Sequence, residues 1–146
     1  MGVRIKGGPG VRANFTLLKL QMEGLQKQWL ELIGEYVKKE AQKRAPIDTR
    51  DMEQAIVSRR TSQKTMAVFV DSSLIDLEEH DGYDYSIAIH EGQGVTWHNL
   101  GPRSLIKQSV YPEIEVGGKF LERATEENRE FIKAQAAAMF KELAKR

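Results

Sequence analysis

The stretch AIVSRRTSQKTMAVFVD, residues 55–71, decides the fold class of this chain. Apolar and polar residues alternate over 55–60 and again over 65–71, which is the spacing of two half-buried strands. Met66, Val68 and Val70 fall on one side of the second run. The four polar residues 61–64 between the runs have the length of a hairpin turn. The stretch therefore predicts an antiparallel β-hairpin over 55–71.

Two segments with helical spacing flank this hairpin. Over residues 14–45, apolar side chains recur every three or four positions, and Pro46 disfavours a helical residue before it. Gly24 divides this segment, so a short helix before a longer one is an alternative to one long helix. Residues 118–145 show the same spacing, with small side chains at 134–138 that permit close helix packing. We expect long helices over 14–45 and 118–145.

The other segments have less regular patterns of apolar and polar residues. Residues 1–13 read as an N-terminal strand or arm, 48–54 as one helical turn, and 72–117 as a loop-rich interface region. Within that region, 85–91 is ambiguous between strand and helix, 104–108 fits one helical turn, and residues around Ile114 and Val116 fit a last strand. The predicted fold class is α+β: one domain, 1–146, with two long helices packed on a small antiparallel β-sheet and long irregular loops.

Composition excludes several classes of protein. The chain has 146 residues and no cysteine, so disulfides, thiolate metal sites and thiol nucleophiles are excluded. Even the longest apolar runs, such as Met66–Val70, are far shorter than the roughly 20 residues of a membrane helix. No apolar segment follows Arg4 and Lys6, so a secretory signal is not expected. These features predict a soluble cytoplasmic protein.

Charge is segregated along the chain although the net charge is only +1. Residues 1–46 hold nine basic and four acidic side chains, whereas 71–91 hold seven acidic side chains and no Lys or Arg. The acidic stretch is either a solvated loop or one of two complementary surfaces for head-to-tail association. A near-neutral total disfavours a nucleic-acid-binding domain, which usually has a strong basic excess.

Candidate catalytic chemistry is sparse. His80, His90 and His98 lie near the acidic stretch, but their spacing matches no established metal-binding pattern. A small metal-dependent nuclease that uses the acidic segment with His90 or His98 is the enzyme alternative. Residues 117–119 precede a helix and offer backbone N–H groups to an anion, although a flexible helix entry is the simpler interpretation. We expect no catalytic residue, no metal and no cofactor.

The two tryptophans are assigned different roles. Trp29 lies on the apolar face of the first helical segment and is predicted to be a core residue. Trp97 lies in a glycine-rich irregular segment, where an exposed aromatic side chain can anchor a partner. Trp97 is therefore a candidate interface residue.

Three segments in order resemble a known family. Residues 44–56 (RAPIDTRDMEQAI) resemble that family's Ala-Pro…Thr-Gly…Leu…Ser-Ile element, and 85–92 (YSIAIHEG) its Tyr-Ala…Glu-x-Gly element. Residues 116–124 (VGGKFLERA) resemble its Gly-Pro-Lys-Phe-Leu-x-Arg-Ala entry into the last helix. Three positions depart from the pattern: Arg50 and Gly118 replace Gly and Pro, and Ala55 replaces Ser.

The family is that of the neck or minor tail-component proteins of tailed double-stranded DNA bacteriophages, in the head–tail connector and tail-completion group. The resemblance implies a non-enzymatic virion structural protein that joins head and tail. Copies would form a sixfold or twelvefold ring between the capsid portal and the tail tube, with DNA passing through as cargo. The implied partners are the chain itself and adjacent head-completion, adaptor and tail proteins. The implied location is the virion neck or tail, after assembly in the host cytoplasm.

The charge segregation suggests which residues would join neighbouring copies. One predicted surface carries the acidic and aromatic residues Asp76, Glu78, Glu79, Asp81 and Trp97. The predicted complementary surface carries Arg59, Arg60 and Arg103. A nonviral protein-interaction module remains the alternative from another class.

Overall fold

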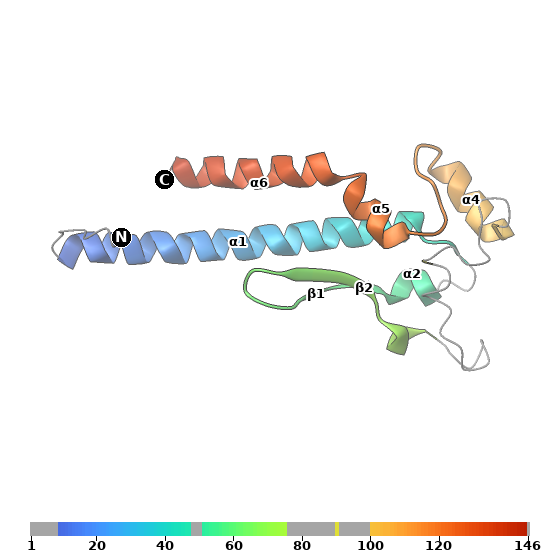
Figure 1. Cartoon of the computed structure of the whole chain (residues 1–146), viewed down its shortest axis with the longest axis horizontal. Coiled ribbons are helices and arrows are strands. Elements are labelled where there is room, and N and C mark those ends of the chain that lie inside the picture. Colours follow the sequence, from blue (N-terminus) through green and yellow to red (C-terminus); the bar gives the residue numbers. More distant parts are fainter. Residues whose placement is uncertain (1–8, 48–50, 76–89, 91–99, 146) are drawn as a thin grey trace, which may run out of the picture.

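The computed structural model describes residues 9–47, 51–75, 90 and 100–145. Its longest element is α1 (Pro9–Arg44), a helix of 36 residues that forms the spine of the molecule (Figure 1). The first predicted helix is confirmed, but it begins at Pro9, where the fixed φ of proline suits a first helical turn. The predicted strand or arm over 1–13 is therefore wrong for 9–13, and 1–8 lie outside the described residues. The helix continues through Gly24 without a break.

The predicted hairpin is confirmed. β1 (Ile56–Arg60) pairs antiparallel with β2 (Met66–Val70), with Ile56 opposite Val70 and Arg60 opposite Met66. The short helix α2 (Asp51–Ala55) leads into β1, and a 3₁₀ turn, η1 (Ser72–Leu74), follows β2. The hairpin lies along the C-terminal half of α1 (Figure 1). Gly34 is buried there, and a Cβ at this position would lie only 2.7 Å from the Cγ atom of Met66.

The predicted C-terminal helix is two helices, α5 (Phe120–Glu126) and α6 (Arg129–Ala144). The chain turns at Asn128, whose side-chain amide donates to the carbonyl of Ala124 at 2.9 Å. The Tyr36 hydroxyl of α1 donates to the same side chain at 2.8 Å, and the Tyr36 ring stacks on Phe131 at 4.4 Å. These contacts fix the bend, so α5 packs on the end of α1 while α6 runs back along it (Figure 1).

The region predicted as loop contains a further helix, α4 (Pro102–Val110). It has nine residues, so the prediction of one turn over 104–108 is too short. Ile114 and Val116 are buried in a turn rather than in a strand, and the sheet within the described residues has two strands. No helix within the described parts of the chain is long and apolar enough to cross a membrane.

The core lies where α1, α5, α2 and β1 meet. Phe120 and Ile56 are its largest side chains and are fully buried. Small residues let α5 approach the end of α1 closely. The buried side chains of the core form one cluster: Val37, Ala41, Ala45, Met52, Ile56, Phe120 and Ala124. The α+β class is thus confirmed, with the core at one end of a long helix rather than spread along it.

Candidate interaction surface

Helix α4 buries its polar side and exposes its apolar side. Ser104 and Lys107 are buried, at 2% and 8% exposure. Leu105, Ile106 and Val110 are 54%, 65% and 62% exposed. Surface helices normally do the opposite, because burying apolar area stabilises the fold. The exposed face of Leu105, Ile106 and Val110, here called the α4 face, is therefore a candidate surface for another molecule.

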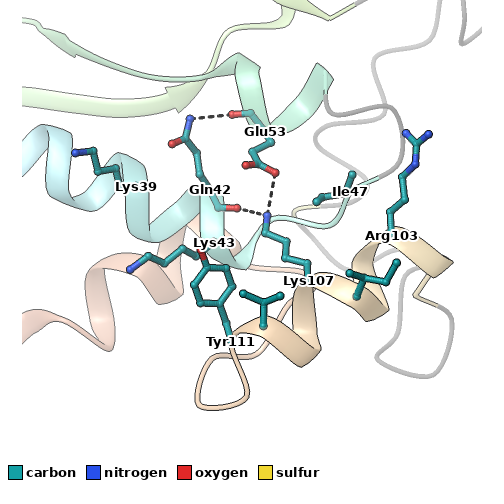
Figure 2. Close-up of a pocket in the computed structure, with 10 residues that line it drawn as sticks. Lys39, Gln42, Lys43, Ile47, Glu53, Arg103, Lys107 and Tyr111 are labelled. Atoms are coloured by element: carbon teal, nitrogen blue, oxygen red, sulfur yellow. Dashed lines mark hydrogen bonds and ion pairs between the residues drawn. The ribbon is translucent and has the colours of Figure 1, made fainter.

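The polar side of α4 is buried because it faces the end of α1, where the last carbonyls of the helix lack hydrogen-bond donors within the helix. The Lys107 ammonium donates to the carbonyl of Ala45 at 2.8 Å and to that of Gln42, and it pairs with the Glu53 carboxylate at 3.1 Å (Figure 2). A cation is favourable at this end of the helix dipole. Burial lowers the pKa of Lys107, and the charge of Glu53 opposes that shift. Lys107 thus serves as a cap for α1.

Two neighbouring polar residues complete the attachment of α4. The Ser104 hydroxyl accepts from the backbone N–H of Ile47 at 2.8 Å and donates to the Ile47 carbonyl at 3.1 Å. The Gln108 amide donates to the carbonyls of Tyr111 and Ile114, and its oxygen accepts from the N–H of Val116 at 2.8 Å. Hydrogen bonds therefore hold the inner side of α4, and its apolar residues remain available on the outside.

Replacing Lys107 by methionine keeps the length of the side chain but removes its three hydrogen bonds. We expect the free energy of unfolding to fall by about 2 kcal/mol, because two carbonyls lose their donor. Denaturant unfolding monitored by circular dichroism measures this, with Lys133→Met on the exposed α6 surface as the matched control. Equal stability of the two variants would contradict a capping role for Lys107.

A pocket of about 640 Å³ lies beside the α4 face, between the end of α1 and α4. It is called the α1–α4 pocket here, and it is lined by Lys39, Gln42, Lys43, Ile47, Glu53, Arg103, Ile106, Lys107, Val110 and Tyr111. Lys39 and Arg103 lie at opposite ends of the pocket (Figure 2). Lys43 pairs with Glu40 at 2.6 Å and lies 5.8 Å from the centre of the Tyr111 ring. The lining is apolar and mainly basic, which suits an acidic segment with apolar side chains.

A buried charge network joins the same end of α1 to α5. The Arg44 side chain is 4% exposed and pairs with Glu40 and Glu127, each at 2.7 Å. Arg123 of α5 extends the network to Glu127 at 3.4 Å and to Glu115 at 3.6 Å. Buried charges persist only when they are paired, so this network fixes α5 and the segment before it against α1.

The network makes the stability of the folded chain depend on pH. Burial would raise the pKa of Glu40, but hydrogen bonds from Lys43 and Arg44 outweigh it and hold the pKa below its ordinary value. The folded chain then keeps this carboxylate ionised where the unfolded chain protonates it, so stability is lost as the pH falls. We expect the wild-type unfolding midpoint in denaturant to fall more between about pH 5 and pH 3 than that of Glu40→Gln. Glu130→Gln, at an exposed residue, should retain the wild-type dependence.

The basic residues predicted to form an interface do not all lie together. Arg59 is exposed on β1, pairs with Asp71 at 3.5 Å and lies over the ring of Phe69. Arg60 folds back onto the hairpin turn and donates to the carbonyls of Ser62 and Gln63. Arg103 lies on a different element, α4. The remaining predicted residues, Asp76, Glu78, Glu79, Asp81 and Trp97, lie outside the described residues.

The other candidate residues have ordinary structural surroundings. Trp29 is half-buried and lines an apolar cavity of about 400 Å³, so its assignment to the core is wrong. His90 contacts the ring of Phe120 edge-on, while His80 and His98 lie outside the described residues. In the described ranges, no group of three or more His, Cys, Asp or Glu side chains is placed to hold a metal ion.

Residues 117–119 form a defined helix entry rather than a flexible one. The N–H of Gly117 donates to the carbonyl of Arg44 at 2.9 Å, which caps α1. Gly117 and Lys119 have φ values of 156° and 58°, a region that glycine adopts at least cost. The N–H of Gly117 is therefore committed to α1 rather than to an anion.

Comparison with known proteins adds no relative. No protein-family model, no curated protein and no solved structure matches the chain.

Proposed function

We propose that this chain is a structural subunit of a tailed bacteriophage virion, a neck, head–tail joining or tail-completion protein. Its copies form a ring between the capsid portal and the tail tube, through which DNA passes. The observation that carries the proposal is the α4 face, which a free-standing monomer would be expected to bury. The sequence resemblance described above supports the same role.

A closed ring needs two different complementary surfaces on each subunit. Helix α4, which carries the α4 face and lines the α1–α4 pocket, lies at one end of the molecule (Figure 1). Toward the other end, α1 and α6 carry exposed apolar side chains: Leu20 at 59%, Met22 at 45% and Phe140 at 58%. Separate apolar surfaces at the two ends support head-to-tail contacts between copies, and contacts with head-completion or tail proteins above and below the ring.

Electron microscopy of the purified protein, alone and mixed with capsids that lack tails, tests this role. We expect closed rings with sixfold or twelvefold symmetry, either free or at the capsid portal. The variant Ile106→Asp/Val110→Asp should abolish rings while remaining folded, because both side chains are exposed in the monomer. Leu32→Asp, an exposed residue of α1, is the control for added charge on an apolar surface. Absence of rings in both samples, or metal-dependent cleavage of DNA by the purified chain, would contradict the proposal.

A further inference from the structure

We infer that the outer edge of β2 takes up an extended segment of a different protein, which adds to the hairpin as a third strand. The same segment places an apolar side chain in the cavity beside Trp29. This cavity of about 400 Å³ is called the α1–β2 cavity here. The inference goes beyond the proposed ring, because the edge belongs to the hairpin rather than to α4.

The register of the hairpin leaves one edge of β2 open. The N–H of Asp71 donates to the carbonyl of Ala55 at 2.7 Å. Hydrogen-bonded and non-hydrogen-bonded pairs alternate along an antiparallel ladder. The backbone groups of Met66, Val68 and Val70 therefore point away from β1. Within the described ranges, these outward N–H and C=O groups have no hydrogen-bond partner.

The two strands of the hairpin protect their outer edges differently. Natural sheets guard exposed edges with charged residues or proline. β1 carries Arg59 and Arg60, and the hydroxyl of Ser58 donates to the Glu35 carboxylate of α1. β2 reads MAVFV, has no charged residue and no proline, and is only partly buried along its whole length. The edge of β2 is therefore the one that suits pairing with another strand.

The α1–β2 cavity adjoins this open edge. Met66 and Val68 line it, so two residues with open backbone groups also face the cavity. Its volume falls within the range of about 300–1,000 Å³ that ligand pockets occupy. The Trp29 indole N–H is buried and has no acceptor in the described part of the chain, whereas buried donors in folded proteins are nearly always bonded. The packing around the cavity is therefore incomplete in the single chain.

These features define the segment that fits. A residue placed directly opposite Val68 would exchange both backbone hydrogen bonds with it and point its side chain to the same face of the sheet. The segment is therefore extended and apolar at alternate positions. Lys64 precedes β2, lines the cavity and is exposed, with no ion-pair partner among the described residues. A carboxylate at the C-terminal end of an antiparallel segment would lie on the side of Lys64.

Helices α5 and α6 favour a single segment over the hairpin of a second copy. Leu121 and Thr125 of α5 and Ile132 of α6 also line the cavity. Two copies that paired through their β2 edges would each bring these helices to the same place beside the new sheet. A lone extended segment avoids that overlap, so we assign the segment to a different protein.

Binding of a synthetic peptide tests the site. The probe is acetyl-KTVTVTVE-amide, with valine at alternate positions and a carboxylate near its C-terminal end. In a Trp97→Phe background Trp29 is the remaining tryptophan, so its fluorescence reports occupation of the cavity. We expect saturable binding with a change in this fluorescence. N-methylation of the middle valine should weaken binding at least about tenfold, because its N–H pairs with β2, whereas N-methylation of the preceding threonine should change it by less than about threefold.

Two proline substitutions test the same edge from the side of the protein. Val68→Pro removes an outward N–H that the hairpin does not use, and proline is tolerated at such edge positions. Ser58→Pro, at the residue opposite in β1, is the matched control. Val68→Pro should bind the probe at least about tenfold more weakly, and Ser58→Pro should bind it as the unmodified chain does. Circular dichroism confirms that both variants are folded.

Charge reversal at Lys64 tests the orientation of the segment. Lys64→Glu should bind the probe at least about threefold more weakly, because two carboxylates then face each other. The peptide acetyl-KTVTVTVK-amide should show the opposite preference and bind Lys64→Glu more tightly than the unmodified chain. Identical affinities of both peptides for both proteins would contradict an antiparallel segment that ends beside Lys64.

The outcomes separate this inference from the proposed function. No saturable binding, or equal losses from N-methylation of valine and threonine, overturns strand addition, and these peptide tests need no variant of the hairpin. Wild-type dimers that Val68→Pro abolishes would overturn the assignment to a different protein. Probe binding by Ile106→Asp/Val110→Asp supports the inference even if no rings form. Rings without probe binding overturn only the inference.

Discussion

Replacing Phe120 by alanine is expected to lower the free energy of unfolding by about 4 kcal/mol, the largest effect of any single truncation considered. Phe120 is fully buried, and it lies in the cluster that joins α5 to α1. The surrounding residues Ala41, Ala45 and Ala124 are small and cannot extend into the space left behind. Loss of the ring therefore leaves a cavity as well as removing buried apolar area.

Denaturant unfolding followed by circular dichroism measures this loss. Phe140→Ala is the matched control, because the same side chain is 58% exposed on α6. We expect the control to change stability by less than about 0.5 kcal/mol. Similar losses for the two variants would show that Phe120 is not at the centre of the core.

Replacing Arg44 by leucine is expected to cost about 3 kcal/mol of stability. Removing the guanidinium takes away the ion pair at 2.7 Å from the Glu40 carboxylate, whose side chain is only 8% exposed. Lys43 still pairs with Glu40, but Glu127 loses its contact with α1. The cost is therefore that of a buried charge left with fewer partners, and α5 should separate from α1 more readily.

Two measurements distinguish this effect from a general loss of surface charge. Arg129→Leu removes an exposed arginine that pairs with Glu126, and it should cost no more than about 0.5 kcal/mol. Hydrogen exchange over 120–126 should increase in Arg44→Leu and remain unchanged in Arg129→Leu. Equal effects of the two substitutions would contradict a role of the network in holding α5.

The elements that follow a simple period were predictable from sequence. The spacing of apolar residues in 14–45 predicted the long helix, and the alternation in 55–71 predicted the hairpin. The bend between α5 and α6 was not predictable, because it depends on contacts of Asn128 and Phe131 with Tyr36, more than 90 residues earlier. The spacing of apolar residues within a helix does not predict a bend that depends on contacts with a residue far away in the sequence.

The candidate site was less predictable than the fold. The order of residues in α4 gives no sign that Lys107 is buried, because its acceptors, the carbonyls of Gln42 and Ala45, lie more than 60 residues earlier. Only Arg103 of the predicted basic set lines the α1–α4 pocket. Lys39 and Lys43 were not predicted as interface residues, because charged side chains on one face of a helix normally face solvent.

We propose that copies of this chain assemble through the α4 face, and the solution mass tests this assembly most directly. Light scattering across protein concentration, in the presence and absence of tailless capsids, should show wild-type oligomers with a mass that is a multiple of 16.6 kDa. Ile106→Asp/Val110→Asp should remain at the monomer mass while retaining the wild-type circular dichroism spectrum. Oligomers that persist in this variant, or a wild-type chain that stays monomeric in both conditions, would contradict the account.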